Sequence, residues 1–493
     1  MPSTLILALD LGSTLFKAAV FDEQLRRLGE GGVPVQYLTL DRGTAELDAE
    51  TAWRQAIETI RSACQSAGIQ PRDLHLISLA SQAQTFTLLD NQGRPSMPLI
   101  SWMDKRAGRE AAAMASQLGA VFHQHCSFPA PAPQLQACQL AHLNASQPKK
   151  LQNAAVWVSL PGWILHRLGG CNAIDPNLAA MSGLYSLEQK TWWPDMLKLT
   201  GLKPHQCPRL VSQGECFVSQ QSCPGLPLGK DVRFCLAGND QTAAAYGNDC
   251  SGEKGIITLG TALVAYRIAG RHRGPFHPVS AWGPYPEGNY YELAVRDEGC
   301  LALDWARSQI MPDAAIQDFD ACARSAGAPG SSPSNEPVFF YPRHLRTPQA
   351  WRGQGGLPQR AQAVYEGIAF ELRTLIVDEL QADLSCQVFH VAGGGGASSH
   401  WLQIIANVLN RPVRRGGGDV LLGAAQMAVG QSPSWRKCLS LCPGLLGAAQ
   451  SALKNGPSGI ENNLVFPEPQ LVERYAHLRA GWESAPHQSP AGE

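Results

Sequence analysis

The stretch that decides the fold is LDLGSTLFKAAV, residues 9–20, in which an apolar strand, a polar turn and a second strand follow one another. It has an echo in ITLGTALVAYRI, residues 257–268, about half of the 493-residue chain further on, with Gly12 aligned on Gly260. Solenoid repeats recur every ~20–50 residues. The longer spacing predicts two duplicated domains, each with its own hairpin; the alternative is a chance similarity between two apolar segments.

Strands and helices alternate after the first hairpin. Apolar runs predict strands at 74–80 and 85–89, and helical periodicity predicts helices at 50–67 and 105–118. Apolar runs without polar alternation are typical of strands that are covered on both faces. The sequence therefore predicts an α/β architecture with a large buried core.

The charge balance excludes several classes of partner. Forty basic and 41 acidic side chains leave a formal charge of -1, so the chain lacks the positive charge that attracts nucleic acid or anionic membranes. The longest weakly polar run, 256–269, is shorter than the ~20 apolar residues of a membrane span. The N-terminus lacks the basic region of a signal peptide. We expect a cytoplasmic protein with no nucleic-acid and no membrane partner.

Motif spacing excludes three familiar kinds of site. The 14 cysteines contain no C-x-x-C pair, and no H-E-x-x-H motif is present, so no zinc site is predicted. The nearest match to a P-loop, residues 225–231, has one residue too few and Asp231 where Ser or Thr must hold Mg²⁺. The glycine run at 393–396 does not follow the G-x-G-x-x-G pattern of dinucleotide-binding folds.

The turns of the two hairpins carry glycine and hydroxyl side chains. These are Gly12, Ser13 and Thr14 in the first turn, and Gly260 and Thr261 in the second. Glycine permits close approach, and oriented backbone N–H groups form a nest for an anion. Two such turns can grip the phosphates of a nucleotide from opposite sides. The alternative is that ordinary β-turns use these residues, as they often do.

Two charged residues flank the first turn. Asp10 ends the first strand, whereas Thr258 stands at the matching place in the second hairpin. Only the first turn therefore has an acid suited to Mg²⁺, with water between the carboxylate and the ion. Lys17 lies on the second strand, where it either contacts phosphate or is a solvated charge.

Two further segments can carry chemistry. The glycine run 393–396 lies between an apolar strand and a helix predicted at 400–409, which is a plausible anion or nucleotide site. Asp240 follows another apolar strand and precedes a small-residue helix at 243–246. It is either the N-cap of that helix or an acid that orients and deprotonates a hydroxyl group.

Ten groups of residues, taken in order, resemble a known family. They are LDLGST (9–14), SQAQ (81–84), ISWMDKR (100–106), DP (175–176) with GLY (183–185), AGNDQ (237–241), LGT (259–261), RTP (346–348), YEGIA (365–369), GGGGASS (393–399) and LGAA (422–425). In this order they resemble the FGGY family of carbohydrate kinases, within the actin/hexokinase/Hsp70-like ATPase superfamily.

The resemblance implies two ribonuclease-H-like domains that flank a central cleft. Residues 1–247 would form an N-terminal domain that mainly binds sugar, and residues 248–480 a C-terminal domain that mainly binds ATP. The polar, proline-containing tail 481–493 is expected to be disordered. A homodimer and a monomer both stay open.

The resemblance also implies roles for individual residues. Asp240 would be the general base, and Asp10 would organise Mg²⁺ through water. The implied ATP contacts are Gly12, Ser13, Thr14, Lys17, Gly260, Thr261, Gly394, Gly395 and Ser398. The implied substrate contacts are Gln82, Gln84, Trp102, Asp104, Asp240 and Gln241, with core packing as the alternative for Trp102.

The residues after Gln82 depart from the patterns of two family branches. Ala83 and Gln84 stand where xylulose kinases usually have Met-His and glycerol kinases Arg-Glu. The predicted activity is ATP- and Mg²⁺-dependent phosphorylation of a primary hydroxyl of a ketose, polyol or sugar acid, with a ketopentose such as xylulose preferred. The alternatives are an ATP-binding switch or filament without a sugar, and a sugar-binding regulator without catalysis.

Overall fold

The computed structural model describes residues 4–41, 43–212, 215–218, 223, 225–248, 254–271, 277–327, 336–382, 385–416, 419–431 and 464–484. Within these ranges two large sheets organise the molecule. The first contains β1 (Ile6–Leu11), β2 (Leu15–Phe21), β3 (Arg27–Pro34), β6 (Leu76–Ser81), β14 (Cys216–Val218) and β15 (Arg233–Asn239). Its strand order is β14-β15-β6-β1-β2-β3.

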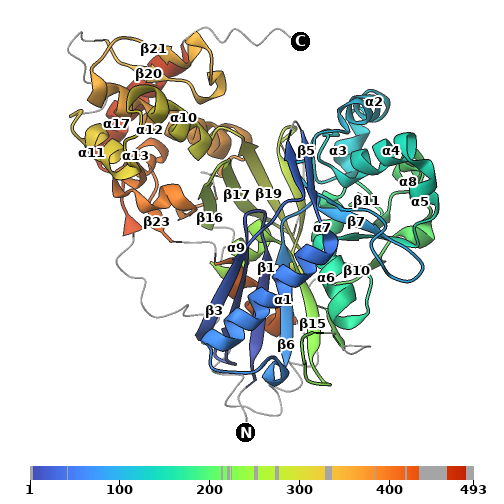
Figure 1. Cartoon of the computed structure of the whole chain (residues 1–493). Coiled ribbons are helices and arrows are strands. Elements are labelled where there is room, and N and C mark those ends of the chain that lie inside the picture. Colours follow the sequence, from blue (N-terminus) through green and yellow to red (C-terminus); the bar gives the residue numbers. More distant parts are fainter. Residues whose placement is uncertain are drawn as a thin grey trace.

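The second sheet comes from the second half of the chain. It contains β16 (Lys254–Leu259), β17 (Leu263–Gly270), β18 (Ala281–Tyr285), β19 (Asn289–Arg296), β22 (Val388–Ala392), β23 (Val413–Arg415) and β24 (Leu464–Val465). Its strand order is β18-β19-β17-β16-β22-β23-β24. Figure 1 shows β16, β17 and β19 near the middle of the view.

The two sheets share one topology. In the first, β1 and β2 form an antiparallel hairpin that continues into β3, while β6 and β15 run parallel to β1. In the second, β16 and β17 form the hairpin, β19 continues it, and β22 and β23 are the parallel strands. The predicted duplication and the α/β architecture are therefore confirmed, and the similarity between the two hairpins is not a chance resemblance.

Helix α1 (Ala49–Ser66) covers one face of the first sheet. The Asp48 side chain caps it by accepting a hydrogen bond from the Thr51 N–H at 2.7 Å, which satisfies one of the free donors of the first turn. Its apolar side chains pack with Leu7 and Leu9 of β1 in one buried cluster. Gly31 of β3 permits close approach, since a Cβ there would lie 2.6 Å from the Ala63 nitrogen.

The opposite face of the first sheet is covered by a helix from far along the chain. Helix α14 (Val420–Gln431) packs on Ile6 and Ala8, and the Ser78 hydroxyl of β6 donates to the Ala424 carbonyl at 2.7 Å. It crosses α9 (Asp240–Gly247), where a Cβ at Gly423 would lie 1.8 Å from the Ala243 carbonyl oxygen. Residues about 180 positions apart in sequence thus meet behind β1 and β15.

The helices of the second half form their own core beside the second sheet. They are α10 (Cys300–Ile310), α11 (Ile316–Arg324), α12 (Leu357–Arg373), α13 (Ser399–Leu409) and α17 (Pro469–Glu483). Figure 1 shows them gathered at the upper left. Helix α17 passes the expected start of the disordered tail at 481, and Trp482 is buried with its indole N–H donating to the Phe340 carbonyl at 2.9 Å. Residues 481–483 are therefore helical, and residues 485–493 of that tail lie outside the described residues.

A smaller sheet and a set of helices extend the first half. The strands are β4 (Thr39–Asp41), β5 (Thr44–Leu47), β7 (Phe86–Leu89), β8 (Leu99–Ile100) and β9 (Val156–Ser159), in the order β4-β5-β8-β7-β9. The helices are α2 (Gly108–Leu118), α3 (Val121–His125), α4 (Gln136–Ser146), α5 (Pro148–Gln152), α6 (Leu160–Gly169), α7 (Pro176–Met181) and α8 (Pro194–Thr200). Short pairs join β10 (Ala173–Ile174) to β13 (Arg209–Leu210), β11 (Tyr185–Ser186) to β12 (Thr191–Trp192), and β20 (Phe339–Phe340) to β21 (Trp351–Arg352). Trp282 of β18 is buried in this part of the molecule, and its backbone N–H donates to the Ser127 carbonyl at 2.8 Å.

Candidate active site

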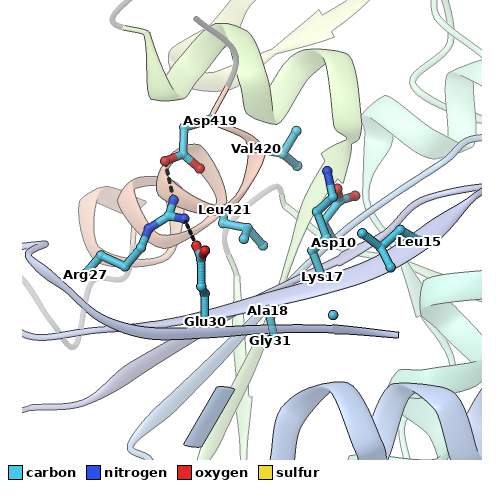
Figure 2. Close-up of a pocket in the computed structure, with 11 residues that line it drawn as sticks. Asp10, Leu15, Lys17, Ala18, Arg27, Glu30, Gly31, Asp419, Val420 and Leu421 are labelled. Atoms are coloured by element: carbon cyan, nitrogen blue, oxygen red, sulfur yellow. Dashed lines mark hydrogen bonds and ion pairs between the residues drawn. The ribbon is translucent and has the colours of Figure 1, made fainter. Parts of the chain in front are cut away.

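Asp10 lies at the end of β1, opposite Lys17 on β2. Its carboxylate is buried, and the Oδ1 atom has no hydrogen-bond partner within the described chain. Burial, reinforced by the nearby carboxylates of Asp240 and Asp419, raises the pKa of Asp10 to about 8 against the opposing effect of the Lys17 ammonium. Figure 2 shows the Asp10 and Lys17 side chains side by side above the hairpin.

A cavity of about 540 Å³ opens beside these two side chains, and we call it the hairpin cavity. Its far wall is an ion-pair cluster in which Arg27 of β3 binds Glu30 at 2.5 Å and also binds Asp419, at the start of α14 (Figure 2). No local motif in the sequence predicts this wall, because the packing of α14 near the edge of β3 joins segments far apart in the chain.

Asp240 is the first residue of α9, directly after β15. The cap of this helix is Asn239, whose side chain accepts from the Thr242 N–H at 2.9 Å, so the N-cap alternative for Asp240 is wrong. Burial raises the pKa of Asp240 to about 6, although the Gln241 N–H donates to its carboxylate at 2.8 Å and opposes the shift. The Asp240 carboxylate therefore lies at the start of α9 and does not cap the helix.

A second cavity, of about 620 Å³, is lined from both halves of the chain, and we call it the shared cavity. It brings together five of the predicted site residues, which are Ser13, Gln82, Gln84, Trp102 and Asp240. Trp102 is 41% exposed, which argues against core packing. The predicted hydroxyl-orienting acid therefore faces the same space as the predicted sugar contacts.

The two glutamines differ in their surroundings. Gln82 is held at both ends of its amide, since Nε2 donates to the Gly12 carbonyl at 3.0 Å and Oε1 accepts from the Thr85 hydroxyl at 3.2 Å. Gln84 has a positive φ of 69°, and its buried Oε1 has no partner among the residues that the structure describes. A non-glycine residue in this strained conformation is often found at ligand-binding sites.

Two predicted substrate contacts lie outside both cavities. Asp104 is fully buried and accepts from the Ala45 N–H at 2.9 Å and from Arg106 at 2.8 Å. Burial alone would raise the pKa of Asp104, but the hydrogen bonds from Arg106 and Ala45 together hold it below its usual range. The Gln241 side chain accepts from the Thr258 hydroxyl at 3.2 Å, which links α9 to β16.

The second hairpin turn is joined to the N-terminus of α10. The Cys300 N–H donates to the Gly260 carbonyl at 2.7 Å, and the Gly299 N–H donates to the Thr261 carbonyl at 3.1 Å. The Thr261 side chain is exposed. Because Gly299 directly follows Glu298, which lines the shared cavity, the second turn lies next to that cavity.

The glycine loop packs on the second hairpin. Gly393 has φ 87°, and a Cβ there would lie 2.4 Å from the Leu259 carbonyl oxygen, whereas a Cβ on Gly394 would meet no atom of the described chain within 4 Å. Gly395 packs against Trp401. Ser398 caps α13 by accepting from the Trp401 N–H at 3.1 Å, and its hydroxyl donates to Asp320. The open space at Gly394 leaves room for the ATP contact that is predicted for this loop.

The donor set around Asp10 fits a hard divalent cation. The Asp10 carboxylate has an oxygen without a hydrogen-bond partner in the described chain, and two further carboxylates lie close enough to raise its pKa. A bound cation would stabilise such a cluster of negative charges. Within the described chain, no group of three or more His, Cys, Asp or Glu side chains is arranged to hold a metal directly.

Sequence reasoning missed part of the shared cavity. Arg296, Asp297 and Glu298, at the end of β19, line it together with Phe128 and Asn239. Charged residues at a strand end are common on surfaces, and no motif distinguished these from others. None of the described cysteines forms a disulfide, and none of the described helices combines the length and the hydrophobicity that a membrane span needs.

Comparison with known proteins gives concordant matches. The model of the N-terminal domain of the FGGY family of carbohydrate kinases matches residues 5–247, and the model of its C-terminal domain matches residues 296–431. A glycerol kinase of Thermococcus onnurineus is 24% identical over 447 residues, and a xylulose kinase of Streptomyces coelicolor is 25% identical over 440 residues. Each alignment covers 86% of this chain and 88% of the relative. The crystal structure of a gluconate kinase from Lactobacillus acidophilus has the same fold, with a TM-score of 0.83 at 21% identity over 97% of both chains.

Proposed function

Because the chain belongs to the FGGY family of carbohydrate kinases, we propose that it transfers the γ-phosphoryl group of ATP to a primary hydroxyl of a ketopentose such as xylulose. The chain is a sugar or polyol kinase with ATP as the phosphate donor. Its named relatives include glycerol, xylulose and gluconate kinases, so their names support the class of substrate without choosing one member.

The position of Asp240 carries the proposal. Its carboxylate faces the shared cavity beside Gln82 and Gln84 and is close enough to Asp10 to raise that residue's pKa. A sugar hydroxyl in the shared cavity can donate its proton to Asp240 while phosphates lie against the hairpin turns. Phosphoryl transfer depends mainly on such positioning and on charge compensation.

The reaction balances with the groups at hand. The sugar hydroxyl oxygen forms a bond to the γ-phosphorus, the bond from that phosphorus to the β–γ bridging oxygen breaks, and ADP leaves with those electrons. The hydroxyl proton passes to the Asp240 carboxylate, whose raised pKa of about 6 suits a base near neutral pH. Asp10 would hold Mg²⁺ through water, and the cation, when bound, supplies charge neutralisation on the phosphates.

A coupled assay of ADP release over a panel of sugars tests the proposal. We expect release that depends on D-xylulose, D-ribulose, glycerol or another neutral sugar, above the rate with ATP alone. An ATP-binding switch would release ADP at one rate with every sugar, and a sugar-binding regulator would be stabilised against heat by a sugar without releasing ADP. Either result would contradict a kinase.

Two further properties belong to the same proposal. We place the enzyme in the cytoplasm, where ATP and Mg²⁺ are abundant, and its substrate is a small molecule. A homodimer stays open beside a monomer, and sedimentation velocity of the purified chain distinguishes them.

A further inference from the structure

The charged wall of the shared cavity is built around one ion pair. Arg296, at the end of β19, lines the cavity and donates through both terminal nitrogens to Glu379, with the longer contact at 3.4 Å. Glu379 is nearly buried, with 10% of its side chain exposed. The Arg296 Nη1 also donates to the Val295 carbonyl at 3.0 Å. The guanidinium is therefore already paired, and its charge is compensated before any substrate arrives.

The remaining charges at the shared cavity are negative. Among the described residues that line it, Arg296 is the only basic side chain, whereas Asp240, Asp297 and Glu298 contribute carboxylates. The cavity therefore has an excess of negative charge on its walls. A substrate carboxylate would be repelled there, because like charges in a partly desolvated cleft interact more strongly than in water.

Hydrogen-bond chemistry points the same way. The buried Gln84 Oε1 lacks a partner in the described chain, and the three carboxylates also accept hydrogen bonds. The cavity also has donors in the Gln134 and Asn239 amides, but its unpaired acceptors are satisfied by ligands that donate, as each sugar hydroxyl does. A carboxylate only accepts, so it would leave these groups unpaired, and unpaired buried polar groups weaken binding.

An apolar surface completes the cavity. Trp102, Val279 and Val295 all line it, although they are 41%, 53% and 41% exposed. Apolar side chains of this kind can cover the C–H face of a sugar or polyol. A carboxylate placed against them would lose water without gaining a partner.

We propose that the shared cavity accepts uncharged ketoses and polyols and rejects sugar acids, and that Glu379 enforces this choice by neutralising Arg296. The inference rests on the proposed function and adds which competing substrates the same cavity rejects. Glu379 acts through Arg296 and is a positioning residue. The gluconate kinase with the same fold makes sugar acids the relevant competitors.

The direct test compares neutral substrates with acids. Values of kcat/KM are measured for D-xylulose, D-ribulose, glycerol and xylitol, and for D-gluconate and D-xylonate. We expect the best neutral substrate to exceed both acids by on the order of 100-fold, as expected for an enzyme that must leave buried groups unpaired to bind the competitor. An acid that equals or exceeds every neutral compound overturns the inference and leaves the kinase proposal intact. No turnover of any compound overturns the kinase proposal itself.

A matched pair of variants tests the role of Glu379. Glu379→Gln removes the carboxylate that is paired with Arg296 and leaves Glu371 as the buried carboxylate that still acts on this charge, so KM for D-gluconate should fall on the order of 10-fold while KM for the best neutral substrate changes little. Asp378→Asn is the control, because it breaks a neighbouring ion pair with Arg479 at 3.0 Å and should change neither KM. Where Glu379→Gln does not fold, the half-exposed Glu298→Gln serves instead, with the same expected direction. Unchanged KM for D-gluconate in a folded variant would overturn the assignment.

Discussion

Two carboxylates near the first hairpin have raised pKa values for different reasons. The pKa of Asp240 is raised to about 6 mainly by burial, whereas that of Asp10 is raised to about 8 because burial is reinforced by Asp240 and Asp419. Asp240 is therefore mostly ionised at neutral pH, as a base must be to accept a proton. Asp10 is mostly protonated at neutral pH until a cation displaces its proton, so the two pKa values suit a base and a cation site.

The pH dependence of turnover should reflect Asp240. Because its carboxylate must be deprotonated, kcat at saturating Mg²⁺ should be constant above about pH 7 and fall about tenfold per pH unit below pH 6. Lowering the Mg²⁺ concentration should move this decline toward pH 8, because protons then compete for Asp10. Initial rates between pH 5 and 9 at two Mg²⁺ concentrations measure both effects. A rate that is flat from pH 5 to 7 contradicts the assignment.

Asp10→Asn should stabilise the Mg²⁺-free protein while abolishing activity. An acid whose pKa is raised by folding, here from 3.8 to about 8, binds its proton more tightly in the folded state. The wild type therefore loses stability as the pH rises from about 4 to 8, and the Asn variant does not. Its advantage should be small near pH 4 and on the order of 5 kcal/mol by pH 8.

Urea unfolding in EDTA at pH 5 and pH 8 measures this difference. Asp22→Asn is a control in the same part of the molecule, because it removes a buried acceptor that binds Arg26 at 2.7 Å and should lower stability. An Asp10→Asn variant that is no more stable than the wild type at pH 8 would argue against a destabilising burial of Asp10.

Sequence motifs identified some residues of the shared cavity and missed others. Gln82, Gln84, Trp102 and Asp240 stand in short polar segments at the ends of apolar strands, where ligands meet the backbone, and motif order singled them out. Arg296 could not be found in this way, because its role depends on Glu379, 83 residues further along the chain.

At the scale of elements, the hairpins were the most predictable part of the fold. Apolar runs on either side of a Gly, Ser and Thr turn predicted the hairpin of β1 and β2, and the echo of that stretch predicted the hairpin of β16 and β17. Their sequence pattern depends only on neighbouring residues and on burial of both faces. The packing of α14 behind β1 depends on a contact between distant segments, and periodicity contains no information about it.

The glycine loop offers a paired test of structure and ligand binding. Gly393→Ala should lower stability by about 2–4 kcal/mol, because the positive φ and the Leu259 carbonyl oxygen leave no room for a Cβ. Gly394→Ala meets no described atom within 4 Å and should change stability by less than about 0.5 kcal/mol. Thermal unfolding gives the stabilities, and ATP titration gives the affinities.

The two variants should separate folding from nucleotide binding. If Gly394 contacts bound ATP, as the family resemblance implies, a methyl group there should raise the Kd for ATP while stability stays unchanged. Equal stability of the Gly393→Ala variant and the wild type would contradict the packing of this loop on β16.

At the scale of the whole molecule, the duplicated sheets face one site. The Asp240 end of α9 is linked to β16 through Gln241 and Thr258, and α14 from the second half covers the first sheet next to Asp10. Elements from both halves therefore surround the same acidic region. Such a junction suits a reaction that must hold two substrates and exclude water.

The most direct test of the account is transfer of label from [γ-³²P]ATP to the best neutral sugar in a single turnover. The wild type should form one labelled sugar phosphate for each ADP released. Asp240→Asn should bind ATP normally and transfer label on the order of 1,000-fold more slowly, because only the proton acceptor is lost. Transfer at the wild-type rate by the Asp240→Asn variant, or ADP formation with no labelled sugar phosphate, would contradict the account.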